Sequence, residues 1–130
     1  MRALLLLAFT AGALGAGCGD VELGTCTGRR PSLSAEVVPA AFEHCAGTGC
    51  HAYGNAQAAY DMLVNVPATR DTCGAGLLVD PGNVAGSYLI NKLTGKGMCP
   101  NTISMPNGER LADAQIQTVV EWICSGAPNN

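Results

Sequence analysis

The chain has few aromatic side chains and little charge for its length. Of its 130 residues, 5% are aromatic and 13% are charged. A chain with so few large side chains has a limited hydrophobic core, and small domains of this kind are often stabilised by a cofactor or by covalent cross-links. The formal net charge is −3 and no cluster of Lys or Arg occurs. The sequence therefore gives no indication of nucleic-acid binding.

The sequence motifs of common enzyme classes are also missing. We find no catalytic triad, no paired carboxylates and no glycine-rich phosphate loop, and the chain has only two histidines, His44 and His51. Internal repeats and low-complexity segments are absent as well. We therefore expect that the protein is not an enzyme and binds no organic substrate.

Cysteine, in contrast, is abundant, and two of the seven cysteines stand in one motif. Residues 45–51 read Cys-Ala-Gly-Thr-Gly-Cys-His. Two cysteines followed directly by histidine are typical of c-type haem attachment, in which each thiol adds to a porphyrin vinyl group and the imidazole binds the iron. Four residues separate these cysteines where the usual pattern has two, and the two glycines among them allow the longer segment to bulge. We predict one covalent haem c per chain, held by Cys45, Cys50 and His51.

Two other interpretations of this motif remain open. Cys45 and Cys50 could form a small disulfide loop, which would leave His51 as an ordinary surface residue. A zinc site is the weaker alternative, because it requires four tetrahedral ligands and the chain offers only two histidines besides its cysteines.

Residues 1–17 have the features of an export signal. Arg2 precedes an apolar run over residues 3–9, and small residues follow it. This run is too short for a membrane-spanning helix, and no later run is long enough. Residues 14–18, Leu-Gly-Ala-Gly-Cys, resemble the lipobox of bacterial lipoproteins, which implies that Cys18 carries lipid. Ordinary signal-peptidase cleavage near Ala16 is the alternative.

Either form of cleavage places the mature protein outside the cytoplasm. We expect a lipoprotein on the periplasmic face of a bacterial membrane, attached to that membrane through its N-terminal lipid. Residues 18–33 are expected to form a tether. Residues 34–130 are expected to form a single domain.

The number of cysteines supports these assignments. If Cys18 carries lipid and Cys45 and Cys50 carry haem, 7 − 3 = 4 cysteines remain. The four are Cys26, Cys73, Cys99 and Cys124. Four cysteines in an oxidising compartment form two disulfides with none left over. The sequence by itself allows three pairings.

Apolar periodicity predicts a mainly α-helical domain with long loops. No segment alternates apolar and polar residues well enough for a sheet. The expected helices cover residues 38–45, 55–66, 84–93 and 113–124. Pro39 is tolerated in the first turn of a helix, Asn83 is a suitable N-cap for the third helix, and Gly95 follows the end of that helix.

A second axial ligand for the iron is expected to be Met105. It precedes Pro106 on the loop before the last predicted helix, and it is far enough from His51 in the chain to reach the opposite face of the haem. The other candidates are Met62, which we expect in the core, Met98, which a disulfide at Cys99 would hold elsewhere, and His44, which precedes the motif on the proximal side. If Met105 does not bind, the open iron site would suit a haem sensor or a peroxidase-like protein.

The order of these features resembles the class I cytochrome c fold, and more closely the cytochrome c-like domains of exported bacterial lipoproteins. The resemblance covers residues 38–127. It is carried by residues 38–42, Cys50-His51, 79–82 with 87–93, 104–106 and 121–127. It implies a single-electron carrier that exchanges electrons with redox partner proteins, with His51 and Met105 as permanent axial ligands.

The same resemblance bears on the disulfides. In that fold the first and last helices pack together, which implies a Cys26–Cys124 bond. Cys73–Cys99 would then connect the loops on either side of the third helix. A haem-free lipoprotein, stabilised by disulfides and with a binding or structural role, is the alternative.

Overall fold

The protein is mainly helical, as the sequence predicts. The computed structural model describes residues 23–45, 51, 55–68 and 73–130. Within these ranges there is no β-strand, only isolated bridges. The helical segments are the π-helix η1 (Leu33–Phe42), the 3₁₀-helix η2 (Glu43–Cys45), and the α-helices α1 (Ala56–Leu63), α2 (Tyr88–Thr94) and α3 (Asp113–Cys124).

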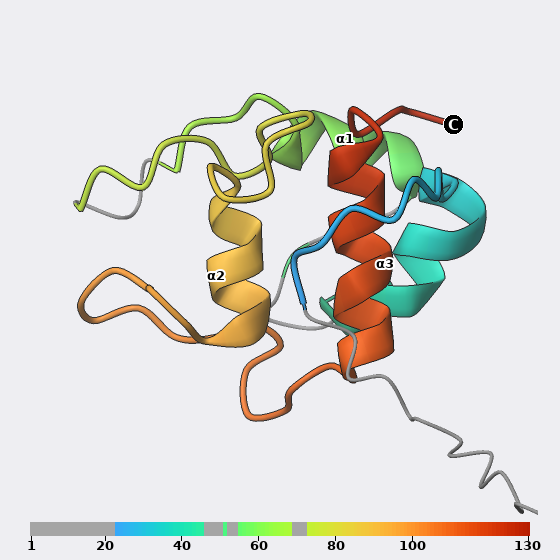
Figure 1. Cartoon of the computed structure of the whole chain (residues 1–130). Helices are drawn as coiled ribbons and strands as arrows, with labels where there is room; N and C mark the ends of the chain where they lie inside the picture. The colour runs from blue at the N-terminus through green and yellow to red at the C-terminus, as the bar shows by residue number, and fades with distance from the viewer. Residues whose placement is uncertain (1–22, 46–50, 52–54, 69–72) are drawn as a thin grey trace, which may run out of the picture.

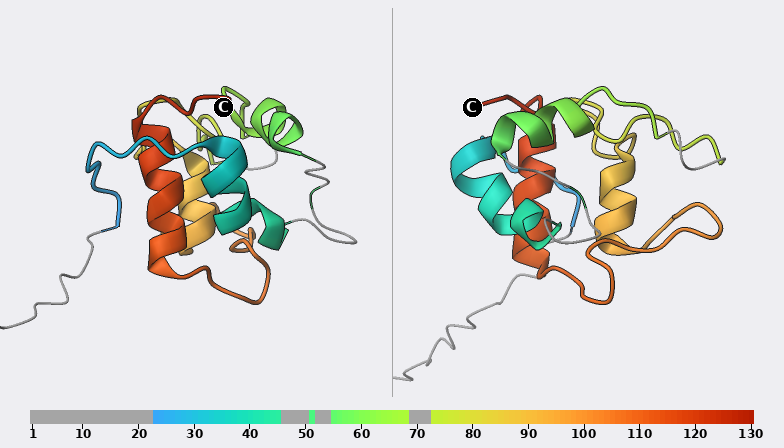
Figure 2. Two further views of the ribbon diagram at one scale, coloured as in Figure 1. Left: turned by 90° about the vertical axis from the view of Figure 1, so that its right-hand side faces the viewer. Right: turned by 180° about the vertical axis from the view of Figure 1, so that it is seen from behind.

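Helix α3 lies at the centre of the domain, with η1 and α2 on two sides of it (Figures 1 and 2). η1 runs antiparallel to α3. At one end of this pair the Ser34 N–H donates to Asn130 O (2.9 Å), and at the other Gln115 Nε2 donates to Ala40 O (2.8 Å). α1 lies across the end of α3 that contains Cys124 (Figure 1).

The two ends of the domain are distinguished below by name. The Cys45 end comprises η2, the last turn of α2, residues 104–112 and the first turn of α3 (Figure 1). The Asn130 end comprises the first turn of η1, the last turn of α3 and residues 125–130. The two further views in Figure 2 show the same segments together at each end of the domain.

Trp122 is the largest side chain in the core. It is fully buried, and its ring meets that of Phe42 edge to face at 6.3 Å between centroids. Its Nε1–H donates to Pro128 O (2.9 Å), so the indole has both apolar contacts and a hydrogen-bond partner. The same cluster includes Leu33, Val37 and Ala41 of η1, Leu63 of α1, Leu93 of α2, and Ile116, Val119 and Ile123 of α3.

The first helix begins earlier than predicted. η1 starts at Leu33, where the Ser32 side chain accepts a hydrogen bond from the Ala35 N–H (3.3 Å), and Pro39 lies inside the helix rather than in its first turn. The turns are wide: the Val37 N–H donates to Ser32 O (3.0 Å), and the Glu43 N–H donates to Val38 O. Such i→i+5 bonding defines a π-helix, and it is the local adjustment that accompanies proline here.

Two further helix boundaries also differ from the prediction. α1 ends at Leu63, three residues early, and α2 starts at Tyr88 rather than residue 84. The Asn83 side chain does not cap a helix. It accepts from the Gly86 N–H (3.0 Å) and donates to Asp80 Oδ2 (2.8 Å), which forms a turn before α2.

The predicted end of α3 is confirmed, and α2 ends at Thr94, one residue later than predicted. Gly95 follows α2 in the left-handed conformation, with φ of 71°. α3 covers residues 113–124, as its apolar stripe predicts.

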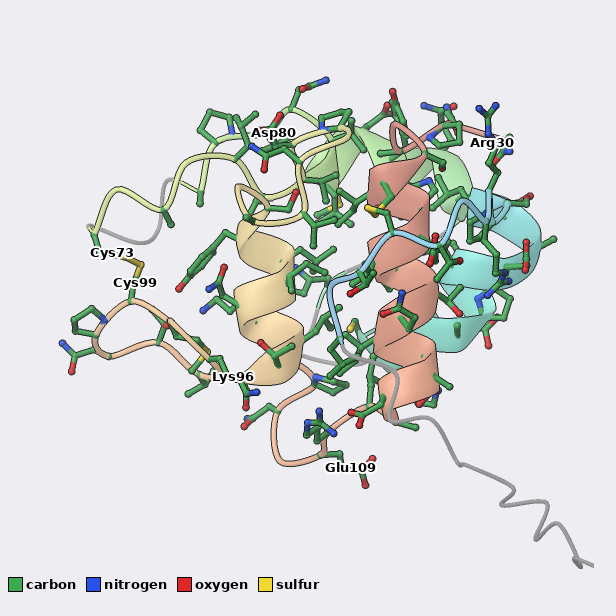
Figure 3. All side chains as sticks on the ribbon, in the orientation of Figure 1. Arg30, Cys73, Asp80, Lys96, Cys99 and Glu109 are labelled. Carbon is green, nitrogen blue, oxygen red and sulfur yellow. A yellow bond between two sulfur atoms is a disulfide. The ribbon has the colours of Figure 1, made fainter. Side chains whose placement is uncertain are left out.

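Both expected disulfides are confirmed. Cys26 is bonded to Cys124. Cys73 is bonded to Cys99, as Figure 3 shows. Their Cα–Cα distances of 5.8 and 5.6 Å lie in the usual range for disulfides. The first bond links the start of the described chain to the last residue of α3.

Residues 23–32, which we call the strap, differ from the tether expected there. The strap lies along α3 and is joined to it by the Cys26–Cys124 disulfide. The Thr27 N–H also donates to Glu121 Oε1 (2.8 Å), and Gln117 Nε2 donates to Thr25 O (2.7 Å). These attachments make the strap part of the folded domain.

Glu121 is a buried carboxylate beneath the strap, with 1% of its surface exposed. Burial by itself raises the pKa of Glu121. Hydrogen bonds from Thr27, from the Gln117 side chain and from the Gly28 backbone outweigh this effect and hold the pKa below its ordinary value. The carboxylate is therefore ionised at neutral pH and binds the strap in its charged form.

Glu121→Gln is expected to destabilise the protein by about 2 kcal/mol at pH 7, because the neutral amide accepts the hydrogen bonds from Thr27 and Gln117 more weakly than the charged carboxylate does. A depressed pKa contributes stability above the ordinary glutamate pKa of about 4.3, and that stability is lost as the pH falls through the lower folded value. Urea unfolding from pH 7 to pH 3 should therefore show a shallower loss of stability for Glu121→Gln than for the native chain. Glu109→Gln, at an exposed carboxylate, is the control; equal pH profiles for the native chain and Glu121→Gln would contradict the prediction.

Candidate functional site

Cys45 is the buried start of the haem-attachment motif. It is the last residue of η2, with 8% of its surface exposed, and its Sγ lies 3.5 Å from Ala41 O. Because η2 continues directly from η1, the packing of η1 against α3 fixes the position of Cys45. The preceding residue, His44, is exposed, and its Nε2 lies 3.3 Å from Gln115 Nε2 in the first turn of α3.

His51 lies close to Cys45 in space as well as in sequence. Its backbone N–H donates to Cys45 O (3.2 Å), so the chain returns to the end of η2 at the histidine. Its side chain is exposed. Cys50, the second predicted thioether residue, lies outside the described residues, as do Cys18 and the predicted signal peptide.

Met105 is positioned by α2. Its N–H donates to Lys92 O (2.9 Å), its side chain is half-buried, and a cis peptide bond joins it to Pro106. This contact places Met105 on the loop that leads from the base of α2 towards α3, which is part of the Cys45 end (Figure 1). The structure thus brings Cys45, His51 and Met105 to the same end of the domain.

The competing methionines have different environments. Met62 is 43% exposed on α1, so the expectation that it belongs to the core was wrong. It occupies the outer face of a short helix whose buried residues are Ala59 and Leu63. Met98 is half-buried and precedes Cys99, which the disulfide to Cys73 holds in place.

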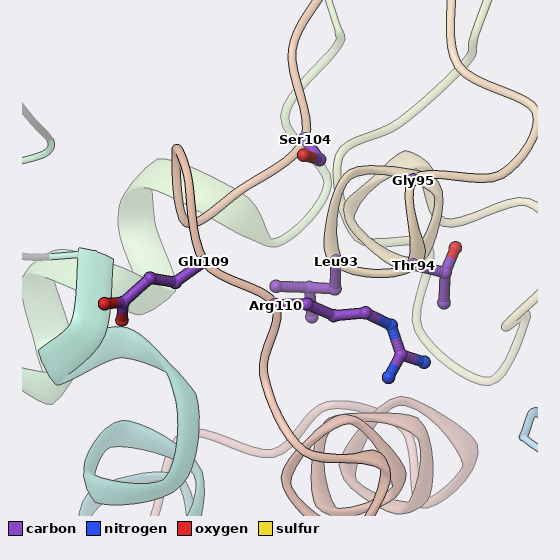
Figure 4. A pocket seen from close by; sticks show the side chains of 6 residues that line it. All are labelled: Leu93, Thr94, Gly95, Ser104, Glu109 and Arg110. Atoms are coloured by element: carbon purple, nitrogen blue, oxygen red, sulfur yellow. The ribbon is translucent and has the colours of Figure 1, made fainter.

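A small cavity lies between the end of α2 and the loop before α3. Its volume is about 70 Å³, and it is lined by Leu93, Thr94, Gly95, Ser104, Glu109 and Arg110 (Figure 4). Arg110 Nη2 also binds Asp113 Oδ1 at 2.5 Å, and both side chains are about half exposed. A space of this size holds only a few waters, so it cannot take a porphyrin or an organic substrate by itself. Sequence patterns did not reveal it, because its walls come from separate segments that meet only in the folded chain.

The donor atoms at the Cys45 end suit a c-type haem. A porphyrin supplies four nitrogen ligands, so the protein has to add only one or two axial ligands and the thiols that anchor the ring. Imidazole at His51, thioether at Met105 and thiol at Cys45 are groups of these kinds. The described ranges contain no group of three or more His, Cys, Asp or Glu side chains that could hold a metal ion.

No protein-family model, curated protein or solved structure matches this chain. The comparisons show no family. The functional argument therefore depends on the residues of the chain and their arrangement. Among the residues that the structure describes, no helix is both long enough and apolar enough to cross a bilayer.

Proposed function

We propose that this protein is a monohaem c-type cytochrome that carries single electrons as a lipoprotein on the periplasmic face of a bacterial membrane. The cysteine and histidine motif at residues 45–51 supports this proposal most directly, together with the return of the chain to Cys45 at His51, where the His51 N–H donates to Cys45 O. The disulfides of the described residues do not conflict with it. The disulfides Cys26–Cys124 and Cys73–Cys99 use four of the seven cysteines, so 7 − 4 = 3 remain outside these bonds. The three are the residues that the sequence assigns to lipid and haem: Cys18, Cys45 and Cys50.

Each residue of the site has a distinct part in this proposal. Cys45 and Cys50 form the thioether bonds, His51 is the proximal ligand, and Met105 is the distal ligand. The haem, when bound, supplies iron that changes reversibly between Fe(II) and Fe(III). Two permanent axial ligands keep the coordination the same in both states, and the soft thioether of Met105 favours the ferrous state. The packing of η1 against α3 is consistent with the cytochrome c-like arrangement that the sequence resembles.

The proposal is tested by producing the full chain together with haem-attachment machinery. Intact mass and the pyridine haemochrome spectrum then report the cofactor and the number of thioether bonds. We expect one covalent haem and two disulfides. A mass without haem and with three disulfides would overturn the proposal in favour of the haem-free lipoprotein, because Cys45 would then pair with Cys50.

Met105→Ala is expected to abolish the Met-to-iron charge-transfer band of the ferric protein and to lower the reduction potential, because the ligand that favours Fe(II) is lost. Met62→Ala is the matched control, since Met62 is exposed on α1. Optical spectra and redox titration of both variants measure the effect. An unchanged charge-transfer band in Met105→Ala would exclude Met105 as the ligand. A high-spin native protein that binds cyanide or carbon monoxide would instead favour the sensor or peroxidase-like alternative.

A further inference from the structure

The segment that ends at Met105 lies beside α2 (Figure 1). This segment, residues 95–105, is called the Met105 loop below. Tyr88 and Lys92 are four positions apart on α2, so they share one face of it, and Lys92 Nζ lies 5.3 Å from the centroid of the Tyr88 ring. Lys92 Nζ donates to Ile103 O (3.3 Å), and Lys92 O accepts from the Met105 N–H (2.9 Å). The end of the Met105 loop is therefore attached to the last turn of α2.

The outer part of the Met105 loop is attached to the Tyr88 hydroxyl. Tyr88 Oη accepts from the Cys99 N–H (3.0 Å) and lies 3.3 Å from Thr102 Oγ1. Thr102 Oγ1 donates its single proton to Cys99 O (2.8 Å). Tyr88 must therefore donate its own proton to Thr102 Oγ1, because each hydroxyl has only one proton to give. The result is a closed network in which both hydroxyls and both backbone groups of Cys99 have partners.

This network is shielded from water. Tyr88 is 3% exposed and Cys99 is 4% exposed, and with Ala68 they form a small apolar cluster separate from the main core. The disulfide to Cys73 holds the Cys99 side chain from another direction (Figure 3). Without the Tyr88 hydroxyl, the Cys99 N–H would be buried with no acceptor, which costs more free energy than an ordinary hydrogen bond contributes. The Met105 loop could recover a partner for this group only by moving away from Tyr88 towards water.

We infer that Tyr88 is a positioning residue for Met105: its hydroxyl holds the Met105 loop against α2 and so keeps the Met105 thioether on the iron. This inference rests on the proposed function, in which Met105 is the distal ligand. The Met105 loop then has a closed state, with Met105 bound, and a minor open state, in which Met105 has left the iron. The Tyr88 hydroxyl stabilises the closed state, so its removal increases the population of the open state.

The test is a titration of the ferric haem protein with imidazole, using the full mature chain and its Tyr88→Phe variant. Imidazole binds the iron only after Met105 has left, so its apparent dissociation constant falls as the open state becomes more populated. Phenylalanine keeps the ring in its apolar cluster but lacks the hydroxyl. We expect Tyr88→Phe to bind imidazole about tenfold more tightly than the native chain. The Met-to-iron charge-transfer band should disappear at correspondingly lower imidazole concentrations.

Four further variants separate positioning from general destabilisation. Thr102→Val removes a hydroxyl of the network without changing the shape of the side chain, and it should tighten imidazole binding several-fold. Thr102→Ser keeps that hydroxyl and should behave as the native chain. Tyr60→Phe, the matched control, removes a hydroxyl from α1, and Glu121→Gln weakens the attachment of the strap to α3. Both should bind imidazole as the native chain does.

The outcomes distinguish this inference from the proposed function. Native imidazole affinity in Tyr88→Phe would overturn the inference, and so would equally tightened binding in Glu121→Gln, because general destabilisation would then explain the effect. In both cases the native charge-transfer band still supports Met105 as the ligand, so the proposed function stands. A native chain that lacks this band, or that binds imidazole as tightly as Met105→Ala, contradicts Met105 as the ligand and the inference with it.

Discussion

Replacement of both Cys26 and Cys124 by Ala should lower the free energy of unfolding by about 4 kcal/mol. The bond joins residues 98 positions apart. In the chain-entropy description, a cross-link that closes a loop of this length raises the free energy of the unfolded chain by about 4.7 kcal/mol, because it removes conformational entropy from that chain. Measured effects are often somewhat smaller. Loss of the bond also frees the strap from α3, which weakens the hydrogen bonds from Thr27 to Glu121 and from Gln117 to Thr25.

The second disulfide provides a matched comparison. Cys73 and Cys99 are 26 positions apart, so the same description gives about 3.5 kcal/mol for their replacement by Ala. Urea unfolding followed by circular dichroism should therefore rank the Cys26 and Cys124 double variant as the less stable, by about 1 kcal/mol. A reversed order would show that loop length does not determine the stabilisation in this protein. The midpoint and the slope of each transition need to be compared, because a changed slope reports a change in the unfolded state.

Trp122→Ala should destabilise the protein by about 4 kcal/mol. Trp122 is fully buried between η1 and α3, and truncation of buried aromatic side chains leaves a cavity at the cost of about 3 to 5 kcal/mol. A domain of this size has a total stability of about 5 to 15 kcal/mol. Trp122→Ala would therefore remove a large fraction of the stability of this domain.

Trp122→Phe separates packing from hydrogen bonding. The phenyl ring retains much of the contact with Phe42 but cannot donate to Pro128 O. We expect a loss of about 2 kcal/mol, from a smaller side chain and an unpaired carbonyl. Met62→Ala, at an exposed residue, should change the stability by less than about 0.5 kcal/mol. Equal stabilities of Trp122→Ala and Met62→Ala in urea unfolding would contradict the assignment of Trp122 to the centre of the core.

Local signals in the sequence predicted those features that depend on neighbouring residues. The apolar stripe of residues 113–124 predicted α3, and Gly95 predicted the end of α2, because helical periodicity and left-handed glycine caps act within a few residues. The cysteine count predicted two disulfides. It allowed three pairings, and the resemblance to cytochrome c domains pointed to the pairing that the structure contains.

Other local signals were overridden by the rest of the fold. Asn83 is a good N-cap in sequence, but its side chain forms a turn with Asp80 and Gly86, so α2 begins later. Pro39 predicted a helix start, yet η1 continues through it with wide turns, because the apolar residues Leu33, Val37 and Ala41 on either side of Pro39 are buried in the core. Met62 fitted the spacing of a helix, but α1 places it on the outer face.

The sequence alone predicted that the protein is mainly helical and that four of its cysteines form two disulfides, and the structure confirms both. That Cys45, Cys50, His51 and Met105 hold a haem and that Cys18 carries lipid stay predictions. Only the tertiary structure decided that the strap is bound to α3, that Glu121 is a buried and ionised carboxylate, and that Cys45, His51 and Met105 lie at one end of the domain. The physical reason is distance along the chain. Thr27 and Glu121 are 94 residues apart, and nothing in the residues around either one specifies the other. Their contact arises when η1 and α3 pack and the strap is placed along the helix.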